Sequence, residues 1–140
     1  MPKHSEISQG RSQAGFNYQI LVTRITKMEY ANASMLDEAS ASAEAALMAK
    51  RLKPNKNLIL ISDDIFESSK QVIQSYCQQL KIQTKVVKIS TENLNQFQGQ
   101  FCGVVMQSPN KYGVLTDYTD TVKHIQNDDA IAILGTDLFA

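Results

Sequence analysis

Four short apolar runs, separated by stretches with helical spacing, are the feature that most limits the fold of this chain. The runs are NLILIS (57–62), TKVVKI (84–89), CGVVMQ (102–107) and AIAILG (130–135). Runs of this length are typical of strands, and continuous apolar character indicates a strand covered on both faces. Helical spacing is found at 13–26, 37–51, 65–80 and 116–126, while 93–100 forms a polar connector. Alternating strands and helices favour right-handed crossovers, so we predict an α/β fold with a mainly parallel sheet between helices.

The composition suits one domain and disfavours two classes of partner. Of the 140 residues, 43% are hydrophobic, which is enough for one modest core. Lysine and arginine balance aspartate and glutamate at 14 each, so no net charge attracts nucleic acid or an anionic membrane surface. The sequence has no apolar run near the roughly 20 residues of a membrane helix and no secretory signal. We therefore expect a cytoplasmic protein.

The cysteines and histidines do not form a recognisable metal or catalytic pattern. Cys77 and Cys102 are far apart in the sequence and have no further cysteine partner. We expect both to be buried or half-buried free thiols and expect no metal site. His4 and His124 lack an acidic or nucleophilic partner in a recognisable arrangement, so we expect surface or half-buried positions for them.

Ligands of parallel sheets bind beyond the carboxyl ends of the strands, which here correspond to 62–66, 107–109 and 136–137. A second candidate is the helix that begins near Asp37, because its start is crowded with Ser and Ala. Small residues there would let backbone N–H groups approach an anion such as a phosphate, with Ser34 adding a hydroxyl donor. Alternatively, Ser34 or Asp37 simply caps the helix and the alanines pack tightly on a neighbouring element.

Several ordered motifs resemble one enzyme family. They are EISQGR (6–11), ANASMLDEASASAEAALMAKR (31–51), SDDIF (62–66), GVVMQSPNKYGVLTDYT (103–119) and GTDLFA (135–140). Together they resemble the P-protein of the glycine cleavage system, a pyridoxal-phosphate-dependent glycine dehydrogenase (decarboxylating). This resemblance implies the large domain of the aspartate-aminotransferase-like fold, fold type I, with a mostly parallel sheet between helices. Residues 1–140 would form a single, incomplete cofactor-binding domain with an N-terminal tail at 1–10.

The resemblance also implies four cofactor-binding residues. The helix start that contains Ser34 and Asp37 would face the cofactor phosphate. Asp137 matches the acidic residue that keeps the pyridine nitrogen protonated, so that the ring can accept electrons. Phe66 stands where the family commonly has a histidine followed by proline, and its ring would stack on the cofactor. Without the resemblance, Asp137 is equally a turn residue and Phe66 a core residue.

The implied reaction removes the carboxylate of glycine as carbon dioxide and passes the aminomethyl group to the lipoyl arm of H-protein. The family's lysine that binds the cofactor covalently lies beyond the part that matches this chain, and no lysine here lies in its motif. We therefore expect a fragment that is inactive alone and that forms a homo-oligomer or joins a complementary chain. The alternative is a non-catalytic remnant or interaction module that pairs with such a chain. In a eukaryote the location would be the mitochondrial matrix.

Overall fold

The computed structural model describes the backbone of residues 3–138 and the side chains of residues 8–138. The chain divides into two compact units, Met1–Leu36 and Asp37–Ala140. No helix in the described part is both long and apolar enough to cross a membrane. Residues 8–138 also contain no group of three or more His, Cys, Asp or Glu side chains that could hold a metal ion.

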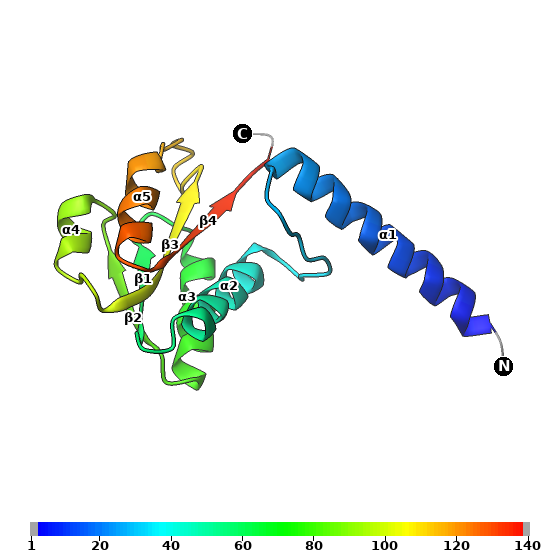
Figure 1. The fold of residues 1–140 in the computed structure, drawn as a ribbon, viewed down its shortest axis with the longest axis horizontal. Helices are drawn as coiled ribbons and strands as arrows, with labels where there is room; N and C mark the ends of the chain where they lie inside the picture. Colours follow the sequence, from blue (N-terminus) through cyan, green and yellow to red (C-terminus); the bar gives the residue numbers. More distant parts are fainter. Residues whose placement is uncertain (1–2, 139–140) are drawn as a thin grey trace. The chain divides into compact units, whose positions relative to one another are not determined.

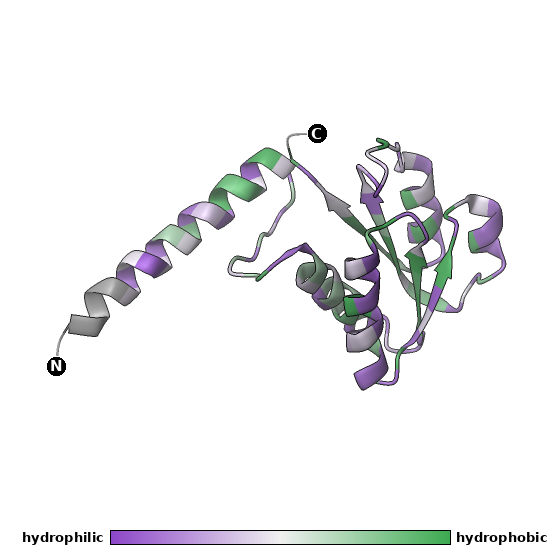
Figure 2. Cartoon of the chain, turned by 180° about the vertical axis from the view of Figure 1, so that it is seen from behind, coloured by the Kyte–Doolittle hydropathy of each residue, from purple (hydrophilic) through white to green (hydrophobic). Residues whose placement is uncertain are grey.

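The first unit consists of the helix α1 (Lys3–Thr26) and the segment that follows it. Hydrophobic residues are concentrated toward the C-terminal end of α1, where helical spacing predicted a helix (Figure 2). The helix ends at the predicted residue, next to Lys27, whose left-handed φ of 61° stops it. Its beginning differs from the expected tail at 1–10, because the backbone is helical from Lys3. A polar helical segment has no apolar periodicity, so the sequence pattern did not reveal it.

The second unit is an α/β layer structure, as predicted (Figure 1). Four strands pair in parallel in the order β2-β1-β3-β4. The elements in chain order are α2 (Glu38–Leu52), β1 (Leu58–Ser62), α3 (Glu67–Gln79), β2 (Gln83–Val87), α4 (Thr91–Asn95), β3 (Phe101–Ser108), α5 (Thr119–Asn127) and β4 (Ile131–Thr136). The short helix α4 begins just before the predicted polar connector and overlaps its first residues, 93–95. Its start is capped by Ser90, whose hydroxyl accepts from the Asn93 N–H at 3.2 Å.

Helices cover both faces of the sheet (Figure 1). On one face, α2 and α3 pack on alternate strand residues, including Ile59, Ile61 and Val105. On the other face, α4 and α5 pack on the intervening residues, including Leu60 and Val104. The strands are therefore apolar on both faces, which explains their continuous apolar sequence.

Both cysteines are buried free thiols, as expected from the sequence. Cys77 lies in α3 and Cys102 in β3, and both belong to the core between helices α2 and α3 and the sheet. Burial raises the pKa of the Cys77 thiol to about 11, so little reactive thiolate is present near neutral pH. These residues fill the core and do not form a reactive site.

The small residues of α2 bring the helix unusually close to the sheet. Ala43, Ala46 and Ala49 are completely buried against it. A Cβ atom added to Gly103 of β3 would lie 2.9 Å from the Ala49 Cβ and 3.2 Å from the Ile59 Cδ1. The tight packing of alanines on a neighbouring element, one of the two readings of this helix, is therefore the one that the structure supports.

Replacing Gly103 by alanine should loosen this contact and destabilise the second unit. We expect Gly103→Ala to lower the free energy of unfolding by about 1–3 kcal/mol, because the added methyl group overpacks the interface between α2 and β3. The measurement is urea unfolding of the full chain followed by circular dichroism. Gly15→Ala is the control, since a Cβ at Gly15 meets nothing within 4 Å. Equal unfolding midpoints for Gly103→Ala and Gly15→Ala would contradict the prediction.

Candidate functional site

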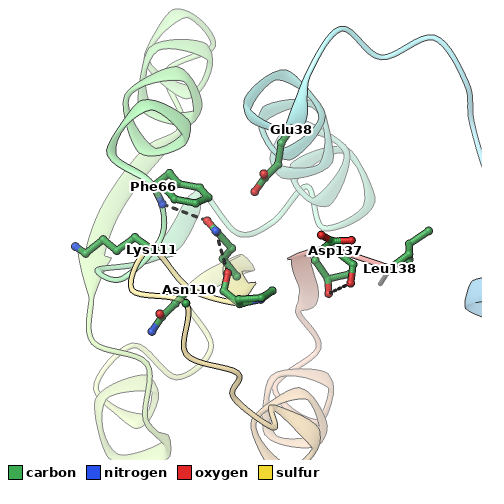
Figure 3. A pocket seen from close by; sticks show the side chains of 10 residues that line it. Glu38, Phe66, Asn110, Lys111, Asp137 and Leu138 are labelled. Atoms are coloured by element: carbon green, nitrogen blue, oxygen red, sulfur yellow. Dashed lines mark hydrogen bonds between the residues drawn. The ribbon is translucent and has the colours of Figure 1, made fainter. Parts of the chain in front are cut away.

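An open pocket of about 650 Å³ lies at the carboxyl edge of the sheet (Figure 3). It is formed by the start of α2 and by the segments that follow β1, β3 and β4. The residues that line it are Glu38, Phe66, Gln107, Pro109, Asn110, Lys111, Gly113, Thr136, Asp137 and Leu138. This is the edge at which parallel α/β sheets bind their ligands, and it coincides with the strand ends singled out from the sequence.

Asp64 joins the segments that follow β1 and β3. Its carboxylate accepts hydrogen bonds from the Ser62 hydroxyl and from the Asn110 amide, the latter at 3.0 Å. Its carbonyl oxygen accepts from the Lys111 N–H at 2.9 Å. The Lys111 ammonium donates to the carbonyl oxygen of Asp63 at 2.8 Å. These contacts tie two loops together and fix one wall of the pocket.

Asn110 also shapes its own loop. Its side-chain oxygen accepts from the backbone N–H groups of Tyr112 at 3.0 Å and Val114 at 3.1 Å. Gly113, with φ of 77°, supplies the left-handed residue of this turn. The side-chain oxygen of the buried Asn110 holds its own loop, and its side-chain nitrogen binds Asp64. One side chain therefore stabilises both the loop and the contact between the two segments.

Gln107, at the end of β3, positions Phe66 at the start of α3. Gln107 is only 5% exposed. Its side-chain oxygen accepts from the Phe66 N–H at 3.1 Å, and its side-chain nitrogen donates to the Pro109 carbonyl at 3.0 Å. No side chain at the Phe66 N-cap position caps the first turn of α3, and the amide from β3 instead accepts from the N–H of the N-cap residue itself. The Phe66 ring, 45% exposed, lies on the pocket (Figure 3).

The fold brings two of the four predicted site residues together. Phe66 follows β1 and Asp137 follows β4, and both line the pocket. Asp37 and Ser34 do not line it. Ser34 belongs to the first unit, where it has a φ of 68° and borders a separate groove with Gly15 and Tyr18. The binding roles assigned to these residues by resemblance stay predictions.

Asp37 is the N-cap of α2. Its carboxylate accepts from the Ser40 N–H at 2.7 Å. This hydrogen bond, with the neighbouring N–H of Ala39, holds the pKa of the exposed carboxyl group below its usual value of 3.8. A negative charge at this position is stabilised by the helix dipole. The capping role, left open as an alternative by the sequence, is the one that the structure supports for Asp37.

The pocket does not fit the phosphate group of pyridoxal phosphate. The carboxylates of Glu38 and Asp137 line it, and the only ammonium group among its lining residues, that of Lys111, points away from them and donates to the backbone carbonyl oxygen of Asp63 (Figure 3). At the adjacent helix start, the Asp37 carboxylate already accepts from a backbone N–H that a phosphate would need. An aromatic ring and a carboxylate suit a pyridine ring, but the phosphate would meet two carboxylates and no ammonium group directed into the pocket.

Sequence reasoning did not name Asn110 or Glu38 as site residues and included Gln107 only in a strand-end range, although Asn110 and Gln107 each carried a signal. Asn110 lies in the segment SPNKYG, whose Pro, Asn and Gly are turn residues. Gln107 is a polar residue at the end of an otherwise apolar strand, where a buried amide needs partners. Glu38 had no comparable signal, because its proximity to the pocket depends on how closely α2 packs on the sheet.

A parallel sheet covered by helices, with a pocket at its carboxyl edge, defines an open α/β protein. Within this class, the chain belongs to the glycine cleavage system P-protein family, whose sequence pattern matches residues 1–140. The expectation drawn from the ordered motifs is thereby confirmed.

The similar proteins are much longer than this chain. It is 40% identical to a glycine dehydrogenase (decarboxylating) from Variovorax paradoxus (strain S110), over 99% of this chain and 15% of that relative. It is 36% identical to the protein of the same name from Vibrio cholerae serotype O1 (strain M66-2), over 99% of this chain and 14% of that relative. The chain therefore spans about one seventh of the length of these curated relatives.

A solved structure has the same fold. The crystal structure of glycine decarboxylase (P-protein) of the glycine cleavage system, in inhibitor-bound form, superposes with a TM-score of 0.84 at 28% identity. The match covers 99% of this chain and 32% of that chain. The predicted α/β fold with a mostly parallel sheet between helices, as part of a larger domain of this enzyme class, is confirmed.

The hydrogen bond of the Asp37 carboxylate at the start of α2 should make part of the free energy of unfolding dependent on pH. Because the folded pKa lies below 3.8, the stabilisation is present above that value and is lost as pH falls through the folded pKa. Asparagine also caps helices but does not titrate. We expect the urea midpoint of the unmodified chain to fall relative to that of Asp37→Asn as pH is lowered from about 4 through the folded pKa, and to stay parallel to it above about pH 5. Midpoints that stay parallel below about pH 4 would contradict the prediction, and Asp37→Ala should be less stable than the unmodified chain above about pH 5.

Removing the Asn110 side chain should destabilise the pocket wall. Asn110→Ala leaves the Asp64 carboxylate without one donor and two backbone N–H groups without an acceptor. We expect a loss of about 1–3 kcal/mol in the free energy of unfolding, measured with urea. The control is Asn55→Ala, at an exposed position in the loop between α2 and β1. A loss no larger than that of the control would show that the loops are held by other contacts.

Proposed function

We propose that this chain is a segment of a glycine dehydrogenase (decarboxylating). That enzyme removes the carboxylate of glycine as carbon dioxide and transfers the aminomethyl group to the lipoyl arm of H-protein. The observation that carries the proposal is the match of residues 1–140 to the P-protein family. The structural similarity at a TM-score of 0.84 supports it independently of the motifs.

Phe66 and Asp137 are the residues that we propose this chain contributes to the active site. Both line the pocket at the carboxyl edge of the sheet. Phe66 offers an aromatic face, and Asp137 offers a carboxylate at the end of β4. Ser34 stays a candidate on the resemblance alone, while Asp37 acts through the stability of α2.

Pyridoxal phosphate is the proposed cofactor of the complete enzyme, where it supplies the electron-accepting ring needed for decarboxylation. The pocket residues described here do not fit its phosphate group, so we assign them no step on the cofactor. We propose that the phosphate ligands and the covalently bound lysine come from polypeptide outside these 140 residues. This agrees with the expectation that the chain alone is inactive and represents one incomplete domain.

Glycine and lipoylated H-protein are the proposed substrate and partner of the complete enzyme. We further propose a homo-oligomer or association with a complementary chain, and a cytoplasmic location. A non-catalytic remnant that merely pairs with another chain is not favoured, because the family match extends over the entire sequence.

The test uses the complete protein that contains this chain. We expect it to exchange labelled bicarbonate into the carboxyl group of glycine when pyridoxal phosphate and lipoylated H-protein are present. We expect Asp137→Asn to reduce the exchange rate about 10-fold or more, as when a charged contact in a binding site is lost. Asp120→Asn, with a 95% exposed side chain in α5, is the matched control.

Two outcomes separate the function from the site. No exchange by the unmodified complete protein would overturn the proposed function. Exchange that is equally fast in Asp137→Asn and Asp120→Asn would leave the function intact and remove Asp137 from the active site. A saturable pyridoxal phosphate signal from the 140-residue chain, lost in Asp137→Ala, would contradict the conclusion that the phosphate does not fit.

A further inference from the structure

Gln107 is a polar residue in a strand that is buried along its whole length. All eight residues of β3 are buried, and Gln107 is 5% exposed. Val105, two residues earlier on the same face of the strand, belongs to the core between α2 and α3 and the sheet. An amide buried at such a place costs free energy unless its polar ends form hydrogen bonds. The presence of a polar residue here is therefore explained by what its hydrogen bonds hold.

The side-chain amide of Gln107 connects two segments that line the pocket. Its oxygen accepts from the Phe66 N–H at 3.1 Å, and its nitrogen donates to the Pro109 carbonyl oxygen at 3.0 Å. A reversed amide would place its NH₂ group against an N–H and its oxygen against a carbonyl oxygen, so one orientation alone satisfies both partners. The amide thus fixes the relative positions of Phe66 and Pro109, which both line the pocket.

The hydrogen bond from Phe66 fixes the backbone that carries a partly exposed ring. The ring is 45% exposed and lies on the pocket (Figure 3). The Phe66 carbonyl oxygen accepts from the Lys70 N–H at 3.0 Å and so begins the hydrogen bonds of α3. The Phe66 N–H lies before the helix, where no helical carbonyl oxygen is in reach, and Gln107 accepts from it. The position of the ring therefore depends on this contact with β3.

We propose that Gln107 is a positioning residue of the active site, which acts on the reaction by holding Phe66 in place. This inference rests on the proposed function and on Phe66 as one of its site residues. A misplacement of about 1 Å in a residue that contacts a ligand can reduce a rate about 100-fold. The competing role for Gln107 is a direct contact with the ligand, because Gln107 itself lines the pocket. The two roles differ in whether the effect of Gln107 requires the Phe66 ring.

A double-mutant cycle separates these roles in the complete protein that contains this chain. The measured quantity is the rate at which labelled bicarbonate enters the carboxyl group of glycine. We expect Gln107→Met, which keeps the volume but loses both hydrogen bonds, to reduce this rate about 10-fold or more. We expect Phe66→Ala to do the same, and Gln107→Met to cause no further reduction in the Phe66→Ala background. An equal reduction by Gln107→Met in both backgrounds would overturn the proposal.

Ser108→Ala is the matched control in the next residue of β3. Ser108 is 8% exposed, and its hydroxyl accepts from the Thr116 N–H at 3.1 Å. Its side chain points to the opposite face of the sheet from that of Gln107. The substitution therefore also removes a buried hydrogen bond, but not one to Phe66. We expect its effect on the rate to be the same whether position 66 carries phenylalanine or alanine.

Amide hydrogen exchange gives a second readout that does not require activity. At single-residue resolution in the complete protein, we expect the Phe66 N–H to exchange at least about ten-fold faster in Gln107→Met than in the unmodified protein or Ser108→Ala. Unchanged exchange would overturn the proposal. If Gln107→Met does not fold, Gln107→Asn takes its place, because its amide is one methylene shorter and cannot reach both partners.

The outcomes distinguish this inference from the proposed function. An unmodified complete protein that does not exchange bicarbonate into glycine would overturn the proposed function, and this role of Gln107 with it. In an active protein, independent effects of Gln107→Met and Phe66→Ala would overturn the positioning role alone and would leave the proposed function intact.

Discussion

The close approach of α2 to the sheet is the contact on which the rest of the second unit depends. At one point of the interface, the absence of a side chain at Gly103 lets Ala49 reach β3. Near the helix start, the Glu38 carboxylate lies 3.2 Å from where a Cβ of Gly135 would be, on the adjacent strand β4. Because Gly103 and Gly135 have no side chains, the two ends of α2 can lie close to strands β3 and β4. The same packing that completes the core also brings Glu38 to the pocket.

This arrangement gives the small residues of α2 a packing role. Such residues would suit a bound phosphate, but the structure shows alanines against the sheet and Asp37 on the exposed N–H groups. The helix dipole is then satisfied by carboxylates of the chain itself, and a second anion would be repelled. The pocket carries one aromatic ring and two carboxylates, and the phosphate-binding role of the helix start stays a prediction.

The sequence predicted the elements better than the site because the two depend on different interactions. The strand runs and the end of α1 follow from local periodicity, so their positions were found within a few residues. The first turns of α1 and the short helix α4 have no periodic apolar residues, so the sequence pattern did not predict them. Phe66 and Asp137 were found through the resemblance and lie on one pocket. The hydrogen bonds of Gln107 and Asp64 were not predictable, because they join segments separated by about 40 residues in the chain.

The two walls of the pocket are connected through the pairing of β4 with β3. One wall is held by side-chain contacts between the segments that follow β1 and β3. The opposite wall, Thr136 to Leu138, continues from β4, which pairs with β3 in the described part of the chain. The register of this pairing places Thr136 beside Ser108, so the ends of both strands reach the pocket together. The position of the Asp137 carboxylate in the proposed active site therefore depends on the pairing of β4 with β3.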